Sequence, residues 1–137
     1  TTLRKFEHQS GLPARLQMQG HGLPLSPELQ IQVLHIVQEA LSNVRKHARA
    51  SRVWVDVEQQ PRWRFEVRDD GIGFSHEPGT IGETHVGLRI MRERAERIGA
   101  LLEVMSTPGR GTSIVLTLPA QRTQAAAQAQ APVEAAA

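Results

Sequence analysis

The sequence predicts a two-layer α/β sandwich, in which a mixed, mostly antiparallel sheet of about five strands carries helices on one face. Two long stretches place apolar residues at helical spacing, and several short stretches alternate between apolar and polar residues. The chain of 137 residues is long enough for one domain with a hydrophobic core. We expect this domain to span residues 1–119 and the Ala/Gln-rich residues 120–137 to form a disordered tail.

Composition excludes several classes of protein. The sequence has no cysteine, which excludes disulfide bridges, thiol catalysis and a thiolate zinc site. No apolar run is long enough to span a bilayer, and the first residues lack the apolar segment of a signal peptide. The pI of 9.9 says little about nucleic-acid binding, because the formal net charge is only +2 and few side chains titrate at moderately alkaline pH.

The longest helical pattern starts after Ser26, which suits an N-cap because its hydroxyl can accept a backbone hydrogen bond. Pro27 fits the first helical position, and the pattern extends to about Ala48. The apolar positions expected to face the core are Leu34, Val37, Leu41, Val44 and Ala48. The stripe on roughly the opposite side consists of Glu39, Asn43, Lys46 and His47. Such a stripe is usually solvated, but Ile36 and Ala40 border this one, which indicates that it is partly shielded from water.

Strands are expected at residues 14–19, 52–58, 63–67, 101–105 and 113–118. The second and third strands are separated by a Gln-Gln-Pro-Arg break, and we expect them to pair as an antiparallel hairpin. This hairpin leads into the sequence Asp69-Asp70-Gly71-Ile72-Gly73. Two carboxylates and two glycines are an unusual end for a strand, but a tight turn with solvated acids explains the pattern as well as a ligand site does.

A second helix is expected after an irregular stretch. Residues 75–85 lack periodicity and contain two glycines and a proline, which predicts a mobile loop. The helix is expected to start near Gly87 and to end at Gly99, a good C-cap. Its buried stripe is expected to consist of Leu88, Met91, Ala95 and Ile98. A glycine-rich turn at residues 107–112 then joins the last two strands.

Four motifs, in this order along the chain, resemble the ATP-binding domain of the GHKL superfamily (gyrase, Hsp90, histidine kinases and MutL). They are QEALSNVRKH at residues 38–47, DDGIGF at residues 69–74, GLRIMRERA at residues 87–95, and GRGT at residues 109–112. Within the superfamily the chain is similar to sensor histidine kinases of the nitrate/nitrite sensor type. The resemblance covers about residues 10–119 and implies the Bergerat ATP-binding fold, a two-layer α/β sandwich.

The resemblance implies that one end of the site holds the adenine base. Asp69 would accept a hydrogen bond from the adenine amino group, because an ionised carboxylate is a pure acceptor. Gly71 and Gly73 would let the backbone approach the base. Thr112 would contact the base side through its hydroxyl, often by way of a water.

The resemblance also implies that the other end holds the phosphates and Mg²⁺. Asn43 and Glu39 are the candidate catalytic and metal-binding residues: Asn43 would bind Mg²⁺ through its amide oxygen, and Glu39 would orient a water or the metal. Lys46 and His47 would lie near the phosphate charge. The backbone N–H groups of Gly87 and Leu88, at a helix start, would bind phosphate oxygens.

The ATP lid implied by the resemblance, residues 74–86, departs from the commonest pattern. Many histidine kinases have two glycines in the second glycine motif, but this chain has His85-Val86-Gly87, and only Gly87 matches. Either the lid is less pliant, or His85 itself touches a phosphate. A surface histidine without a role explains His85 equally well.

The implied reaction is Mg²⁺-dependent transfer of the ATP γ-phosphoryl group to a histidine. That histidine would lie on a dimerisation domain absent from this chain, and the phosphoryl group would pass to a response regulator. The resemblance implies a cytoplasmic domain of a homodimeric protein anchored in the bacterial inner membrane. We expect no contact of this region with the membrane and no nucleic-acid partner.

Two alternatives belong to other classes. A serine kinase of the anti-sigma type shares the same motifs, although the stretch MRERA at residues 91–95 favours the sensor kinases. A basic nucleic-acid-binding module would bind DNA in a salt-dependent way and would be indifferent to ATP. The aromatic content of 4% offers few platforms on which bases could stack, which disfavours the second alternative.

Overall fold

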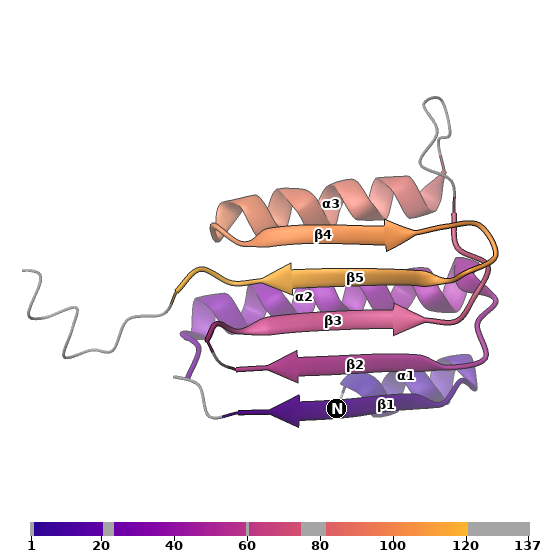
Figure 1. The fold of residues 1–137 in the computed structure, drawn as a ribbon, viewed down its shortest axis with the longest axis horizontal. Coiled ribbons are helices and arrows are strands. Elements are labelled where there is room, and N and C mark those ends of the chain that lie inside the picture. Colours follow the sequence, from indigo (N-terminus) through magenta and orange to yellow (C-terminus); the bar gives the residue numbers. More distant parts are fainter. Residues whose placement is uncertain (1, 21–23, 60, 75–81, 121–137) are drawn as a thin grey trace, which may run out of the picture.

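The computed structural model describes residues 2–20, 24–59, 61–74 and 82–120 (Figure 1). It contains one five-stranded sheet, three α-helices and one short π-helix, which continues the second α-helix. In chain order, the elements are α1 (Thr2–Ser10), β1 (Ala14–Gln19), α2 (Pro27–Asn43), the π-helix η1 (Val44–Ala48), β2 (Val53–Glu58), β3 (Arg64–Asp69), α3 (Glu83–Arg97), β4 (Leu101–Ser106) and β5 (Thr112–Thr117).

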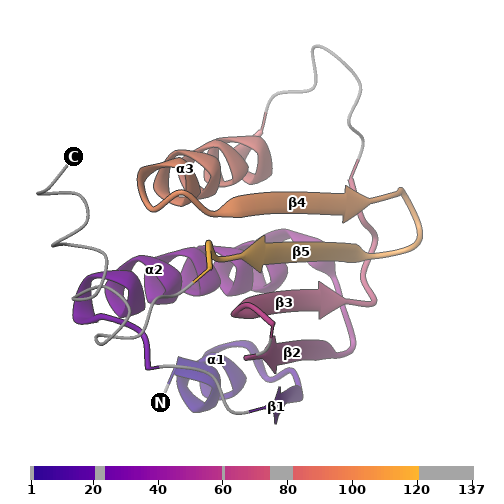
Figure 2. The same cartoon turned by 60° about the vertical axis from the view of Figure 1, so that its left-hand side comes forward.

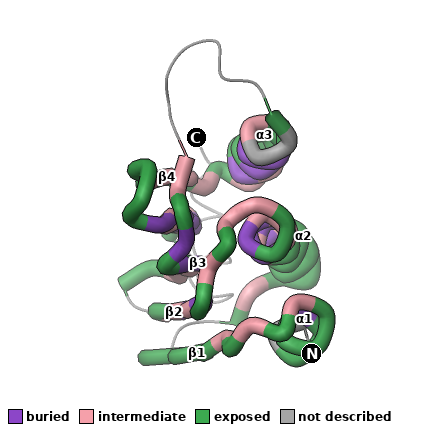
Figure 3. The backbone as a smooth tube through the Cα atoms, turned by 90° about the vertical axis from the view of Figure 1, so that its right-hand side faces the viewer, coloured by how far each residue is buried: buried purple, intermediate pink, exposed green. Residues whose placement is uncertain are grey.

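The sheet has the strand order β1-β2-β3-β5-β4, with β1 parallel to β2 and every other pair antiparallel. All three α-helices lie on the same face of this sheet, as Figures 1 and 2 show, and the view along the strands in Figure 3 separates the two layers. The predicted two-layer sandwich with a mixed, mostly antiparallel sheet is therefore confirmed, and so is the hairpin formed by β2 and β3.

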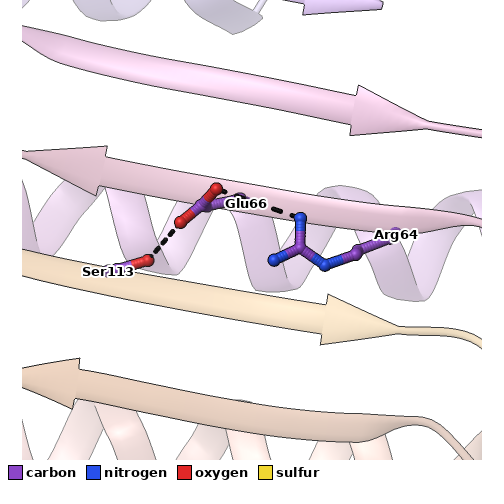
Figure 4. Close-up of polar contacts among 3 residues, drawn as sticks. All are labelled: Arg64, Glu66 and Ser113. Carbon is purple, nitrogen blue, oxygen red and sulfur yellow. Dashed lines mark hydrogen bonds and ion pairs between the residues drawn. The ribbon is translucent and has the colours of Figure 1, made fainter. Parts of the chain in front are cut away.

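The helix-free face of the sheet carries several polar contacts. Ser113 Oγ donates a hydrogen bond to Glu66, and Arg64 lies 3.9 Å from the same carboxylate (Figure 4). The guanidinium of Arg68 stacks over Trp54 at 4.8 Å from the ring centroid. The Glu66–Ser113 and Trp54–Arg68 contacts join neighbouring strands on this face.

Helix α2 begins as expected, because Ser26 Oγ accepts a hydrogen bond from the Leu29 N–H at 3.2 Å. The expected core face was wrong in part. Leu34 is 43% exposed, whereas Val33 and Ile36 are 6% and 1% exposed. The figures show α2 between α1 and α3, so packing on both sides decides which positions are buried. Leu41 and Val44 are buried as predicted.

Helix α3 begins at Glu83, four residues before the expected start near Gly87. The Val86 N–H donates to the Gly82 carbonyl, so the first turn is already closed there. The expected buried stripe is confirmed for Leu88, Met91 and Ala95, and Ile98 packs against it. Gly99 caps the C-terminus at φ +68°, with its N–H bonded to the Glu96 carbonyl, as predicted.

Two expectations fall largely outside the described residues: the mobile loop, at residues 75–81, and the disordered tail, at residues 121–137. Among the residues that the structure does describe, no helix is both long enough and apolar enough to cross a membrane.

Candidate functional site

A cavity of about 220 Å³ lies between α2, the start of α3 and the helix-covered face of the sheet. The predicted site residues that line it are Asn43, His47, Asp69, Gly73, Leu88 and Thr112. Five other predicted residues do not form part of its wall, namely Glu39, Lys46, Gly71, His85 and Gly87. The structure therefore brings together residues from all four sequence motifs, although they lie far apart along the chain.

One end of the cavity is formed by residues that lie opposite each other on adjacent strands. The register pairs Ser106 with Thr112, Thr112 with Asp69, and Asp69 with Val53. Side chains directly opposite each other in a sheet point to the same face, and Val53 points into the core. The Asp69 carboxylate and the Thr112 hydroxyl therefore reach the cavity from adjacent strands.

Asp69 is a buried carboxylate, only 5% exposed. Its Oδ1 accepts a hydrogen bond from the Gly71 N–H at 2.8 Å, and its carboxylate also accepts the backbone N–H of Thr112. Burial raises the pKa of Asp69 above its ordinary value, and the two N–H groups reduce this rise without cancelling it. The carboxylate is thus held in place by backbone and keeps lone pairs for a donor in the cavity.

Asp70 has a different role from its neighbour. Its exposed carboxylate accepts hydrogen bonds from the N–H of Ser51 at 2.8 Å, the N–H of Arg52 at 3.0 Å and the Ser51 hydroxyl. The hydrogen bond from the Ser51 hydroxyl is the main reason why the pKa of Asp70 lies below its usual value. Asp70 is therefore exposed but not merely solvated, because it ties the end of β3 to the start of β2.

The glycines of the strand end lie against other backbone segments. A Cβ on Gly71 would lie 2.1 Å from the Ala48 carbonyl oxygen, and a Cβ on Gly73 would lie 2.2 Å from that of Thr107. Gly73 also has a φ of +67°, which favours glycine. Close packing of the chain on itself explains both residues in this structure, and their role in admitting a base stays a prediction.

At the other end of the cavity, α2 and α3 approach closely. A Cβ on Gly87 would lie 2.5 Å from Glu39 Oε1 and 3.1 Å from Asn43 Oδ1, so a side chain there would displace the end of the Glu39 side chain. Asn43 Nδ2 is buried and has no hydrogen-bond partner among the described residues. Lys46 is exposed outside the cavity wall. A buried amide without a partner at the cavity edge fits a ligand with oxygen atoms, such as a phosphate.

Two side chains at the cavity edge were not anticipated. The ring of Phe74 lines the cavity and meets the ring of His85 edge-on, with the centroids 5.5 Å apart. Ser106 lies behind the wall and contacts both the Phe74 N–H and the Thr112 hydroxyl. In the sequence, the only feature that could have drawn attention to Ser106 was its position just before the glycine-rich turn.

The family model for histidine kinase-, DNA gyrase B- and HSP90-like ATPases matches residues 28–122. The chain is 32% identical over 118 residues to the signal transduction histidine-protein kinase/phosphatase DegS of Brevibacillus brevis, covering 85% of this chain and 30% of that protein. It is 36% identical over 119 residues to the nitrate/nitrite sensor protein NarQ of Escherichia coli K12, covering 84% of this chain and 20% of that protein.

Among solved structures, the histidine kinase domain of the blue-light activated histidine kinase from Erythrobacter litoralis EL346 superposes with a TM-score of 0.64. The sequences are 25% identical, and the match covers 85% of this chain and 57% of that one. The chain therefore spans less than two thirds of each of these relatives. It belongs to the family of histidine kinase-, DNA gyrase B- and HSP90-like ATPases, and it is an ATP-binding domain of the kind found in sensor histidine kinases.

Proposed function

We propose that the cavity holds ATP as its Mg²⁺ complex and that the domain presents the γ-phosphoryl group for transfer to a histidine. The observation that carries this proposal is that one cavity brings together the buried carboxylate of Asp69 and Asn43, whose buried amide nitrogen has no hydrogen-bond partner among the described residues. The carboxylate suits an exocyclic amino group, and the amide suits a phosphate and its metal. The two ends thus match the two chemically different ends of ATP.

At the base end, Asp69 accepts a hydrogen bond from the adenine amino group, and Thr112 contacts the base with its hydroxyl. Two backbone N–H groups already hold the Asp69 carboxylate. The acceptor therefore needs no rearrangement when the base arrives, which lowers the cost of binding.

At the phosphate end, Asn43 binds the phosphates and, through its amide oxygen, the metal. Bound Mg²⁺ supplies neutralisation of phosphate charge and holds the phosphates in a fixed geometry. The described residues contain no group of three or more acidic or histidine side chains that could hold a metal ion. This fits a metal held mainly by ATP, with Asn43 and Glu39 as its few protein contacts.

Other residues act around the phosphates. His47 lines the cavity, and Lys46 lies outside its wall, where it faces the charge of the triphosphate at longer range. Because α3 begins at Glu83 and the Val86 N–H already donates to the Gly82 carbonyl, the helical hydrogen bonds of α3 start before Gly87 in this structure. Binding of phosphate by the N–H groups of Gly87 and Leu88 therefore requires the first turn of α3 to open.

The rest of the reaction lies outside this chain. We propose that the acceptor histidine belongs to a dimerisation domain of the same kinase, that the kinase is a homodimer anchored in the inner membrane, and that a response regulator receives the phosphoryl group. The names of the relatives, which are sensor histidine kinases, favour a histidine acceptor over a serine acceptor. An acid-labile phosphate on the acceptor would support this choice, and an acid-stable one would contradict it.

The adenine assignment is tested by calorimetric titration of ATP, with and without Mg²⁺, into the wild-type domain and Asp69→Asn. The substitution replaces an ionic acceptor by a neutral amide, so ATP affinity should fall at least about tenfold. Circular dichroism checks that the variant is folded. Equal affinity in the two proteins would refute the assignment of Asp69 to adenine.

A further inference from the structure

A groove of about 750 Å³ lies between α1 and the C-terminal half of α2. Figures 2 and 3 show α1 and α3 on opposite sides of α2, so this groove and the ATP cavity use different sides of the same helix. The groove includes the buried side chains of Phe6 and Leu41, which join α1 to α2. No residue lines both the groove and the cavity. The groove is therefore a separate feature of the fold.

The charged side chains that line this groove are basic. Arg4 and Lys5 on α1 and Arg45 on η1 are exposed and belong to its lining. In the part of the chain that the structure describes, no acidic residue lines the groove, and none of these three side chains has an ion-pair partner. Glu7 on α1 accepts the Ala14 N–H at 3.3 Å instead. A cleft with charges of one sign concentrates the potential and attracts ligands of opposite charge, so the groove favours an anionic ligand.

The side of α2 that lines the groove continues toward the start of the helix as an apolar surface. Gln38, Ser42 and Arg45 line the groove at helical spacing, and Leu34 and Ile31 extend the same spacing toward the N-terminus. Leu34 and Ile31 are 43% and 54% exposed. From Ile31 to Arg45 this stripe is about 21 Å long. A ligand that covers it needs apolar groups at one end and acidic groups at the other.

We propose that the groove and the apolar surface beside it bind an acidic amphipathic helix of a partner protein. Its apolar side chains would pack on Ile31 and Leu34, and its carboxylates would pair with Arg4, Lys5 and Arg45, in the manner of a helix bound in a groove. A nucleic-acid backbone or a lipid headgroup would pair with the basic side chains but would leave the two aliphatic ones exposed to water. This inference does not depend on the proposed function, because the groove and the ATP cavity share no residue.

The inference is tested by fluorescence-anisotropy titration with a labelled synthetic peptide. The peptide is about 14 residues long, to match the stripe, and consists of leucine, alanine and glutamate with the leucines on one helical face. It should bind the wild-type domain with a Kd of about 10–100 μM, and the Kd should rise with salt concentration. The double variant Arg4→Glu, Arg45→Glu replaces attraction by repulsion and should raise the Kd at least about tenfold. Leu34→Gln should raise it about fivefold.

Two controls separate this surface from general attraction between charges. The double variant Arg92→Glu, Arg97→Glu makes the same change of charge at exposed positions of α3 outside the groove, and it should change the Kd by less than about twofold. A peptide of the same composition in shuffled order keeps the charge but loses the apolar face, and it should bind at least about fivefold more weakly. Circular dichroism checks that each variant is folded.

Four results would overturn the inference: no binding of the ordered peptide, equal binding of the shuffled peptide, an equal effect of the two double variants, or an unchanged Kd in Leu34→Gln. The comparison of the two peptides uses the wild-type domain alone, so it decides the matter even if a variant does not fold. Tighter binding of single-stranded DNA, or of vesicles of anionic phospholipid, than of the ordered peptide would also overturn it, because the groove would then recognise phosphate.

Discussion

At the base end of the cavity the Asp69 carboxylate is held by two backbone N–H groups, whereas at the phosphate end the amide nitrogen of Asn43 is buried without a partner among the described residues. The base end is built by strands and turns in backbone contact. The phosphate end is built by side chains on two helices that meet at Gly87. The base end is therefore organised before a ligand arrives, and the phosphate end acquires its hydrogen bonds from the ligand.

The largest expected effect comes from breaking the backbone contact that supports the base end. In Gly71→Ala the new Cβ would lie 2.1 Å from the Ala48 carbonyl oxygen, and backbone on both sides must move. The free energy of unfolding should fall by about 2–3 kcal/mol, measured by urea denaturation. Gly82→Ala is the control, because a Cβ there meets nothing within 4 Å, and it should cost less than about 1 kcal/mol. Equal losses in the two variants would show that the contact at Gly71 is unimportant.

A smaller effect, on ligand binding instead of folding, is expected at the phosphate end. Asn43→Ala removes an amide whose nitrogen makes no hydrogen bond within the described residues, so stability should change by less than about 1 kcal/mol. Affinity for Mg²⁺-ATP should fall about tenfold, because a contact to charged groups is lost, while affinity for adenosine should stay unchanged. Calorimetry with both ligands measures this difference.

The control for Asn43→Ala is Gln38→Ala, an exposed position on the same helix outside the cavity wall. It should change neither affinity nor stability. Loss of the folded state in Asn43→Ala, seen by circular dichroism, would mean that Asn43 supports the contact between α2 and α3. The contrast between the two ends of the cavity would then be wrong.

The local signals in the sequence predicted the elements well. Ser26 and Gly99 were recognised as caps because capping depends on a few neighbouring residues. The exposure of Leu34 next to buried Val33 could not be predicted, since it depends on how α1 and α3 flank α2. The start of α3 at Glu83 was also missed, because the loop before it has no helical periodicity.

In the candidate site, too, features set by neighbouring residues were predictable and features set by distant segments were not. Asp69 and Asn43 were assigned because the motifs around them, DDGIGF and QEALSNVRKH, resemble those of the GHKL superfamily and are each contiguous in the sequence. Ser106 was missed because its partners, Phe74 and Thr112, come from other segments that only the strand order β3-β5-β4 brings together. The hydrogen bonds of Asp70 could not be predicted for the same reason, since Ser51 precedes it by 19 residues.

The smallest expected effect is a pH dependence that the burial of Asp69 confers on stability. Because the folded-state pKa of Asp69 is raised, the folded protein binds the proton more tightly than the unfolded chain does. Ionisation of Asp69 therefore costs stability above its folded pKa, and this cost disappears as the pH falls through that pKa. The stability of the wild-type domain relative to Asp69→Asn should thus increase from pH 7 toward pH 4. Urea denaturation of both proteins across this range measures the difference. A relative stability that falls on acidification would mean that the hydrogen bonds from Gly71 and Thr112 outweigh burial, and that the base end is organised around a fully stabilised carboxylate.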